Sequence, residues 1–124
     1  MSDAFIPEQL FVHDETEMSD GNWIGTFNIK NKETSGEGCK WIGDVKPYGS
    51  KYDQFPEHEE AKAYAKLFAA SPDMITELKE NHEFLLRMYN SINTYGNAVN
   101  LDQIQTEMRD RMAKQLPIIA KATT

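Results

Sequence analysis

The hydrophobic residues of this 124-residue chain repeat with one period in its first half and with a different period in its second half. Apolar and polar positions alternate over residues 22–29 and 39–45, and a period of two is typical of half-buried β-strands. From residue 57 onward the apolar residues recur at steps of three and four, which is the period of an amphipathic helix. The change of period predicts an α+β fold, in which a small antiparallel β-sheet precedes a helical region.

The predicted sheet is a β-hairpin over residues 22–46, because residues 30–38 form a polar, glycine-containing loop between the two alternating runs. Trp23 and Trp41 lie on the inward faces of the two strands, where we expect them to form a cross-strand pair in the core. An aromatic binding platform is the alternative interpretation of the two tryptophans. Residues 10–13 are expected to add a third strand to this sheet.

Three helices are expected within residues 57–116, and prolines and a glycine-containing turn define their ends. Ser71 can cap a helix and Pro72 fits the first helical position, so the chain is expected to begin its second helix there. That helix runs to a short turn at residues 96–97, and Pro117 is expected to end or kink the third helix. Because the turn is short, the second and third helices are expected to pack as an antiparallel helical hairpin.

The second predicted helix has apolar residues on more than one of its sides. Met74, Phe84 and Met88 lie off its most regular stripe, so this helix needs more than one neighbour to cover its apolar residues. Apolar surface that the rest of the chain leaves uncovered marks an interface. We therefore expect a homo-oligomer that is built through the helical hairpin. The regular stripe consists of Ile75, Leu78, His82, Leu85, Tyr89 and Ile92.

Length and composition indicate a single domain over residues 1–124, with a partly irregular arm at 1–21 before the hairpin and the helical region. No apolar run approaches the roughly 20 residues that a membrane-spanning helix needs. The first residues do not have the basic and apolar regions of a secretory signal. The single cysteine, Cys39, cannot form an internal disulfide, which is typical of proteins in a reducing cytoplasm. We therefore expect a cytoplasmic protein that does not associate with membranes.

The formal net charge of −7 is distributed unevenly along the chain. Residues 1–60 have 13 acidic and 5 basic side chains, a net charge of −8, whereas residues 61–124 have 7 acidic and 8 basic side chains, a net charge of +1. An acidic surface repels phosphate groups, so direct binding of nucleic acid is not expected. The acidic half either keeps the protein soluble or engages a basic partner by imitating nucleic acid.

The sequence patterns of common catalytic and metal sites are missing from this chain. Its seven glycines do not form a phosphate-binding loop before a helix. His58 is followed by two glutamates but not by a histidine four residues later, so the zinc-protease motif is incomplete. Three histidines and one cysteine do not suggest a four-ligand zinc site. We therefore expect no enzyme activity, no metal and no cofactor.

Four residues of the predicted helical hairpin have side chains that suit a nucleotide ligand. The rings of His82 and Tyr89 can stack on a base. Arg109 and Arg111 have planar guanidinium groups, which bind phosphate through two parallel hydrogen bonds. The alternatives are that the two rings belong to the hydrophobic core, and that the arginines keep the surface soluble or form ion pairs between subunits.

One segment resembles a sequence that is frequent in small accessory proteins of tailed phages and prophages. Residues 59–74 read Glu-Glu-Ala-Lys-Ala-Tyr-Ala-Lys-Leu-Phe-Ala-Ala-Ser-Pro-Asp-Met, and the phage segment reads approximately Glu-Ala-Asn-Ala-Lys-Leu-Ile-Ala-Ala-Ala-Pro-Glu-Leu. The resemblance extends over residues 22–90 in the order of a tryptophan-bearing hairpin, a loop and a helical restart. The chain departs from the phage pattern at Tyr64, Phe68 and Ser71.

The chain is also similar in length and in its arginine-bearing helical hairpin to phage sponges that counter Thoeris defence by sequestering a cyclic ADP-ribose-like signal. This resemblance implies a phage-encoded, non-enzymatic counter-defence protein that sequesters a nucleotide-derived immune signal in the host cytoplasm. The alternative is an anti-CRISPR protein or an acidic nucleic-acid mimic that inhibits a basic host protein. The acidic residues Asp14, Glu15, Glu17 and Asp20 motivate this alternative.

Overall fold

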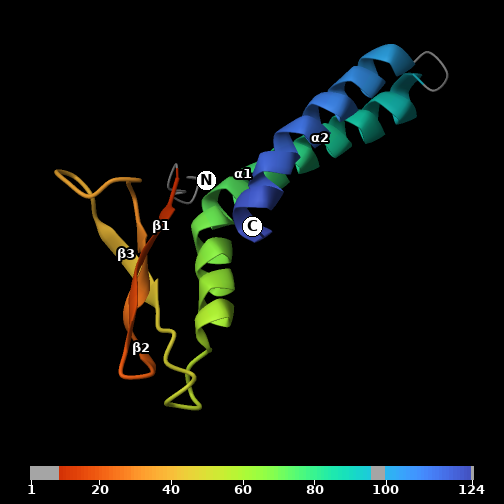
Figure 1. Ribbon diagram of the computed structural model, residues 1–124. Coiled ribbons are helices and arrows are strands. Elements are labelled where there is room, and N and C mark those ends of the chain that lie inside the picture. Colours follow the sequence, from red (N-terminus) through yellow and green to blue (C-terminus); the bar gives the residue numbers. More distant parts are fainter. Residues whose placement is uncertain (1–8, 96–99, 124) are drawn as a thin grey trace.

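The computed structural model describes residues 9–95 and 100–123 of the chain, and it confirms an α+β fold with a three-stranded antiparallel sheet (Figure 1). The strands come first in the sequence and the helices follow, as the change of period predicts. The predicted turn at residues 96–97 lies outside the described residues. The elements are β1 (Phe11–Ser19), β2 (Asn22–Lys30), β3 (Trp41–Val45), α1 (His58–Tyr95) and α2 (Leu101–Thr123).

The three strands lie in the order β1-β2-β3, and each pairs with its sequence neighbour. A two-residue turn joins β1 to β2, and both of its residues, Asp20 and Gly21, have positive φ, as a type I′ turn requires. The third strand that was expected at residues 10–13 is present from Phe11 onward, as the beginning of the nine-residue strand β1. Residues 11–19 of the expected irregular arm belong to this strand, and residues 1–8 lie outside the described part.

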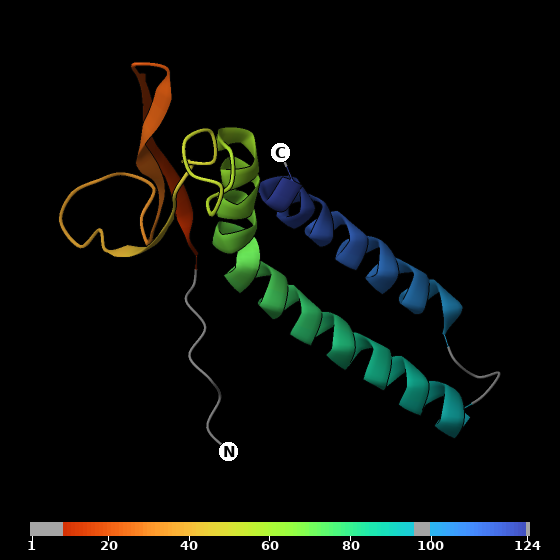
Figure 2. The same ribbon diagram turned by 90° about the horizontal axis from the view of Figure 1, so that it is seen from below.

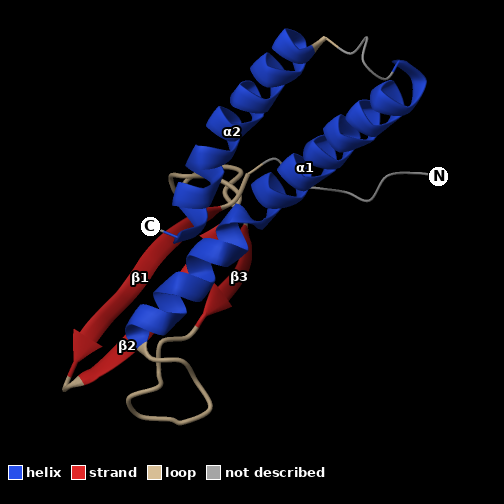
Figure 3. Ribbon diagram, turned by 90° about the vertical axis from the view of Figure 1, so that its right-hand side faces the viewer, coloured by secondary structure: helices blue, strands red, loops and turns tan. Residues whose placement is uncertain are grey.

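One face of the sheet is covered by the first part of α1, which crosses it in Figure 3. Phe27 and Ile29 on β2 are completely buried, as their alternation predicts. Ala61, Ala65 and Ala69 recur every four residues on α1 and form the other side of this core. Their small side chains let the helix backbone approach the sheet closely.

The expected pairing of the two tryptophans is wrong. Trp23 lies opposite Met18 on β1, whereas Trp41 lies opposite Lys30 and is 62% exposed. The register of β2 and β3 is the physical reason, because it aligns Trp41 with Lys30, at the opposite end of β2 from Trp23. The register shift at Ile29 and Lys30 also moves the Trp41 side chain to the other face of the sheet.

The expectation of three helices is also wrong, because α1 continues through Pro72 without a break. A proline inside a helix leaves the carbonyl group four residues earlier without its N–H partner. Here that carbonyl belongs to Phe68, and the hydroxyl of Ser71 donates a hydrogen bond to it at 2.7 Å. Ser71 thus compensates for the lost bond instead of capping a new helix. The last helix likewise continues through Pro117 to Thr123.

The part of α1 after Pro72 and the whole of α2 form an antiparallel helical hairpin, as predicted. The hairpin projects away from the sheet, while the first part of α1 stays beside the strands (Figures 1 and 2). Among the described residues, no helix combines the length and the apolar composition that are needed to cross a membrane.

Candidate functional site

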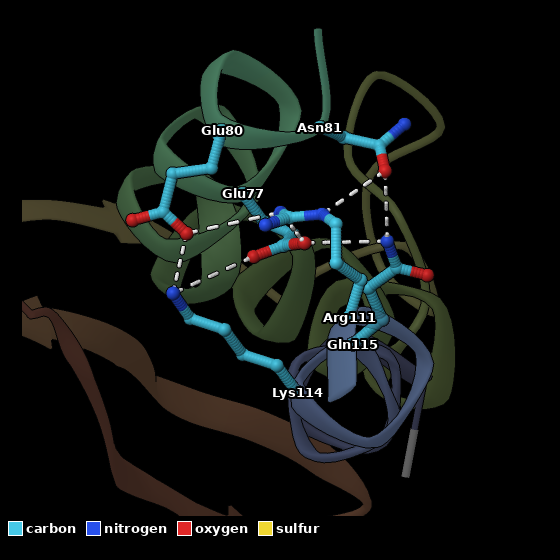
Figure 4. A network of polar contacts seen from close by, with 6 residues as sticks. All are labelled: Glu77, Glu80, Asn81, Arg111, Lys114 and Gln115. Carbon is cyan, nitrogen blue, oxygen red and sulfur yellow. Dashed lines mark hydrogen bonds and ion pairs between the residues drawn. The ribbon is translucent and has the colours of Figure 1, made fainter. Parts of the chain in front are cut away.

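The contact between α1 and α2 combines a network of polar side chains (Figure 4) with the ring of Phe84, which is 6% exposed and lies on the same side of α1 as Glu77. The predicted apolar stripe lies outside this contact. Glu77 on α1 is only 7% exposed, and its carboxylate accepts hydrogen bonds from Arg111 and, at 3.2 Å, from Gln115. Asn81 accepts further bonds from Arg111 at 3.3 Å and from Gln115 at 3.4 Å. A buried carboxylate and a guanidinium therefore hold the two helices together.

Further ion pairs surround this contact. Lys114 donates to Glu80, and its ammonium group also lies 4.0 Å from the second carboxylate oxygen of Glu77. The hydrogen bond from Lys114 and the positive charges of Lys114 and Arg111 hold the pKa of Glu80 below its usual value, although partial burial raises it. The Oε2 atom of Glu77 is the one buried side-chain polar atom without a hydrogen-bond partner in the described part of the chain.

The predicted apolar stripe of α1 faces solvent in the single chain. A second stripe on α2 is exposed as well, and the exposed fraction of each residue in the two stripes lies between 43% and 75%. We call the two stripes together the apolar face. It consists of the stripe residues Ile75, Leu78, Leu85, Tyr89 and Ile92 of α1 with the adjoining Met74, and of Leu101, Met108, Met112, Leu116 and Ile119 of α2.

The two stripes adjoin on one side of the hairpin. A shallow groove of about 240 Å³ is lined by Leu78 of α1 together with Ile119 of α2. A larger cavity of about 620 Å³ lies between β1 and the hairpin, where Phe11, Thr76 and Lys114 are among its lining residues. Thr76 and Leu78 point in directions about 200° apart because they are two residues apart on a helix. The sheet therefore lies against the side of the hairpin that is opposite to the apolar face.

Three of the four predicted ligand residues are exposed on the hairpin. His82 and Tyr89 lie on α1 and Arg109 lies on α2, and none of the three forms a hydrogen bond or ion pair with another described residue. Arg111, by contrast, faces α1 and is held by Glu77 and Asn81. Its guanidinium already has partners within the chain.

These residues do not converge within one chain. Arg109 precedes Arg111 by two residues, which is about 200° around the helix, so it points away from α1. His82 follows Asn81, which faces α2, and it shares with Tyr89 the outer edge of the apolar face on α1. The rings and the free guanidinium therefore lie at opposite edges of the apolar face.

The two edges are nevertheless aligned along the hairpin axis. Arg111 contacts Asn81, and Glu107 contacts Arg87 at 3.3 Å. Arg109 lies midway between these two α2 residues, so it is level with the part of α1 between residues 81 and 87. His82 lies in that part of α1.

A further polar cluster, which no local sequence pattern indicates, joins the start of α1 to the sheet. The imidazole of His58 stacks on Trp23, with ring centroids 3.6 Å apart and ring planes at 14°. Its Nε2 atom lies 3.2 Å from the hydroxyl of Thr16, which donates to Asp14 at 2.5 Å. Burial raises the pKa of Asp14, but the two hydrogen bonds from Thr16, together with the charges of His58 and Lys62, outweigh it and hold the pKa below its usual value.

This cluster fixes the first turn of α1 against β1 and β2. His58 and Thr16 are 42 residues apart in the sequence, so no local pattern could bring them together. Among the described residues, no group of three or more histidine, cysteine, aspartate or glutamate side chains could hold a metal ion.

The chain was compared with protein-family models, with curated proteins and with solved structures, and no match was found in any of the three comparisons.

Proposed function

We propose that this chain is a phage-encoded, non-enzymatic counter-defence protein that binds and sequesters a nucleotide-derived immune signal in the host cytoplasm. A cyclic ADP-ribose-like molecule or a cyclic nucleotide is the class of ligand. One observation carries the proposal: two rings and one guanidinium are exposed along the edges of the apolar face, without a partner among the described residues.

The chemistry of these three side chains matches the two parts of a nucleotide. Tyr89 is 64% exposed, so its ring is free to stack on a base, and His82 offers a second ring on the same edge. Arg109 can bind phosphate through a pair of charge-assisted hydrogen bonds. Arg111 was also expected to bind phosphate, but its guanidinium is engaged by Glu77, so the proposal assigns the phosphate contact to Arg109.

Calorimetric titration with cyclic ADP-ribose isomers and cyclic dinucleotides tests the proposal. We expect Arg109→Ala to weaken binding by about 1.5–3 kcal/mol, the contribution of a charge-assisted hydrogen bond, which is roughly 10- to 150-fold in Kd. Arg87→Ala is the matched control, because it removes an arginine that is paired with Glu107 on the same hairpin. The proposal fails if no nucleotide binds at millimolar concentration, or if both variants weaken binding equally.

The complex of the protein with its nucleotide also tests whether the protein converts the bound nucleotide into a product. After binding, the protein is denatured and the released ligand is analysed by chromatography and mass spectrometry. A sponge returns the nucleotide intact after prolonged incubation. A product that accumulates with time would instead show turnover and would contradict the non-enzymatic proposal.

A second candidate function is inhibition of a basic host protein, as expected for an anti-CRISPR protein or a nucleic-acid mimic. Glu17 and Asp20 are exposed near the β1–β2 turn, and their carboxylates have no cation partner among the described residues. Such a partner should be retained from host lysate at low salt and released at high salt. Glu17→Gln combined with Asp20→Asn should abolish its retention, and a lysate that yields no salt-sensitive partner excludes this candidate.

A further inference from the structure

We infer that a second copy of this chain packs on the apolar face, with a two-fold axis parallel to the hairpin, so that the two hairpins form a four-helix bundle. In this bundle α1 of each copy lies against α2 of the other. The apolar face alone is the reason to expect a second copy as the partner that covers it. The direction of the two-fold axis rests on the proposed function.

The distribution of side chains on the hairpin is the first argument. The two helices of one chain meet through Phe84 and the polar network of Glu77 and Arg111, while the leucines and isoleucines of the apolar face are exposed on both helices. A side chain of this size that is half exposed leaves on the order of 100 Å² in water. The apolar face therefore presents roughly 1,000 Å², more than the roughly 300–600 Å² of the largest patch on a typical monomer.

This area also suits a stable dimer. Each partner in a standard-size interface buries about 800 Å². The sheet does not obstruct such a dimer, because β1 packs near Thr76 and Lys114 on the opposite side of the hairpin. The apolar face is thus large enough for a second copy and is open to it.

The positions of the three proposed ligand residues determine the direction of the axis. A two-fold axis parallel to the helices keeps each residue at its level along the hairpin and brings the outer edge of α1 beside the outer edge of the partner's α2. Arg109 and His82 lie at the same level, so the partner's Arg109 comes next to His82 and within two helical turns of Tyr89. Each dimer then has two equivalent sites, and each site is incomplete without the second copy.

A two-fold axis perpendicular to the helices gives a different arrangement. It places α1 against the partner's α1 and α2 against the partner's α2. The rings would then gather on one edge and the two Arg109 side chains on the other, where their like charges repel each other. A nucleotide could not contact a ring and the guanidinium at once in that dimer.

Chemical cross-linking distinguishes these arrangements without any ligand. Cys39→Ser removes the single native thiol, and His82→Cys and Arg109→Cys are each added to that background. A short bismaleimide should join the chains only when the two cysteine variants are unfolded together, refolded as a mixture and then treated. The expected product is a covalent dimer of about 28 kDa, twice the 14.2 kDa of one chain. Cross-linking of the His82→Cys variant alone would overturn the parallel axis.

Light scattering coupled to size-exclusion chromatography tests whether the chain dimerises through the apolar face. The wild-type protein should have the mass of a dimer at tens of micromolar, and Leu116→Asp in the apolar face should give a folded monomer. Leu67→Asp is the control, because Leu67 is an exposed leucine on the first part of α1, outside the hairpin. A monomeric wild type, or a Leu116→Asp variant that stays dimeric and folded by circular dichroism, would overturn the inference.

The two proposals can fail separately. A dimer with the expected cross-link that binds none of the nucleotides refutes the proposed function, whereas the cross-link still supports the dimer and its parallel axis. A monomer that binds a nucleotide with loss of affinity in Arg109→Ala refutes the dimer and supports the function.

Discussion

Replacement of Arg111 by methionine should destabilise the protein strongly, because it leaves the carboxylate of Glu77 buried without its cation. Glu77 is 7% exposed, and breaking a buried pair of this kind costs about 3–5 kcal/mol. Two contacts remain in the variant: the amide of Gln115 at 3.2 Å and the ammonium group of Lys114 at 4.0 Å. We therefore expect a loss at the lower end, about 3 kcal/mol of unfolding free energy.

Urea denaturation followed by circular dichroism measures this loss. Every variant has to be compared at one protein concentration, because the stability of a dimer depends on concentration. Lys114→Met is the matched control, since it removes a cation of the same network whose side chain is 53% exposed, and it should cost less than about 1 kcal/mol. Combining Arg111→Met with Glu77→Leu removes both buried charges and should restore most of the lost stability.

Two results would contradict this prediction. If Arg111→Met is no more destabilising than Lys114→Met, burial of the Glu77 carboxylate does not control the stability of the hairpin. If the double variant is less stable than Arg111→Met alone, the pair contributes more than the avoidance of an unpaired charge.

Two other substitutions test the sheet and the outer ion pairs. Gly25→Ala should destabilise the chain by several kcal/mol in urea denaturation, because the new Cβ would lie 2.0 Å from the backbone carbonyl oxygen of Glu15. Gly21→Ala is the control: Gly21 has a similar φ, but no atom lies within 4 Å of the new Cβ, so this variant should lose only about 1–2 kcal/mol. Glu80 has a lowered pKa in the folded chain, so its contribution to stability is complete above its usual value near 4.5 and is lost as the pH falls through the folded pKa. Glu80→Gln should therefore flatten the acid side of the stability profile, whereas an equal effect of the exposed Glu83→Gln would contradict this assignment.

The sequence by itself was sufficient for the type and order of most elements. The alternation around Phe27 and Ile29 predicts a half-buried strand, and both side chains are buried. The steps of three and four after residue 57 predict helices. Both predictions succeed because the period of the apolar residues reflects the local backbone geometry. The helical hairpin also follows from the sequence, since two helices that are joined by a short connection pack antiparallel.

Only the tertiary structure decided which faces these elements bury. A register shift places the side chain of Trp41 on the exposed face of the sheet, and hydrogen bonding by Ser71 allows α1 to continue through Pro72. The predicted ligand residues were found on the hairpin, but their placement at opposite edges of the apolar face depends on how α1 and α2 pack.

A helix with apolar residues on two sides can meet its neighbour through either side, and the period of the apolar residues does not distinguish the two sides. The contact between Glu77 and Arg111 selects one side and leaves the apolar stripe exposed, because a buried carboxylate needs a cation that lies 34 residues away in the sequence.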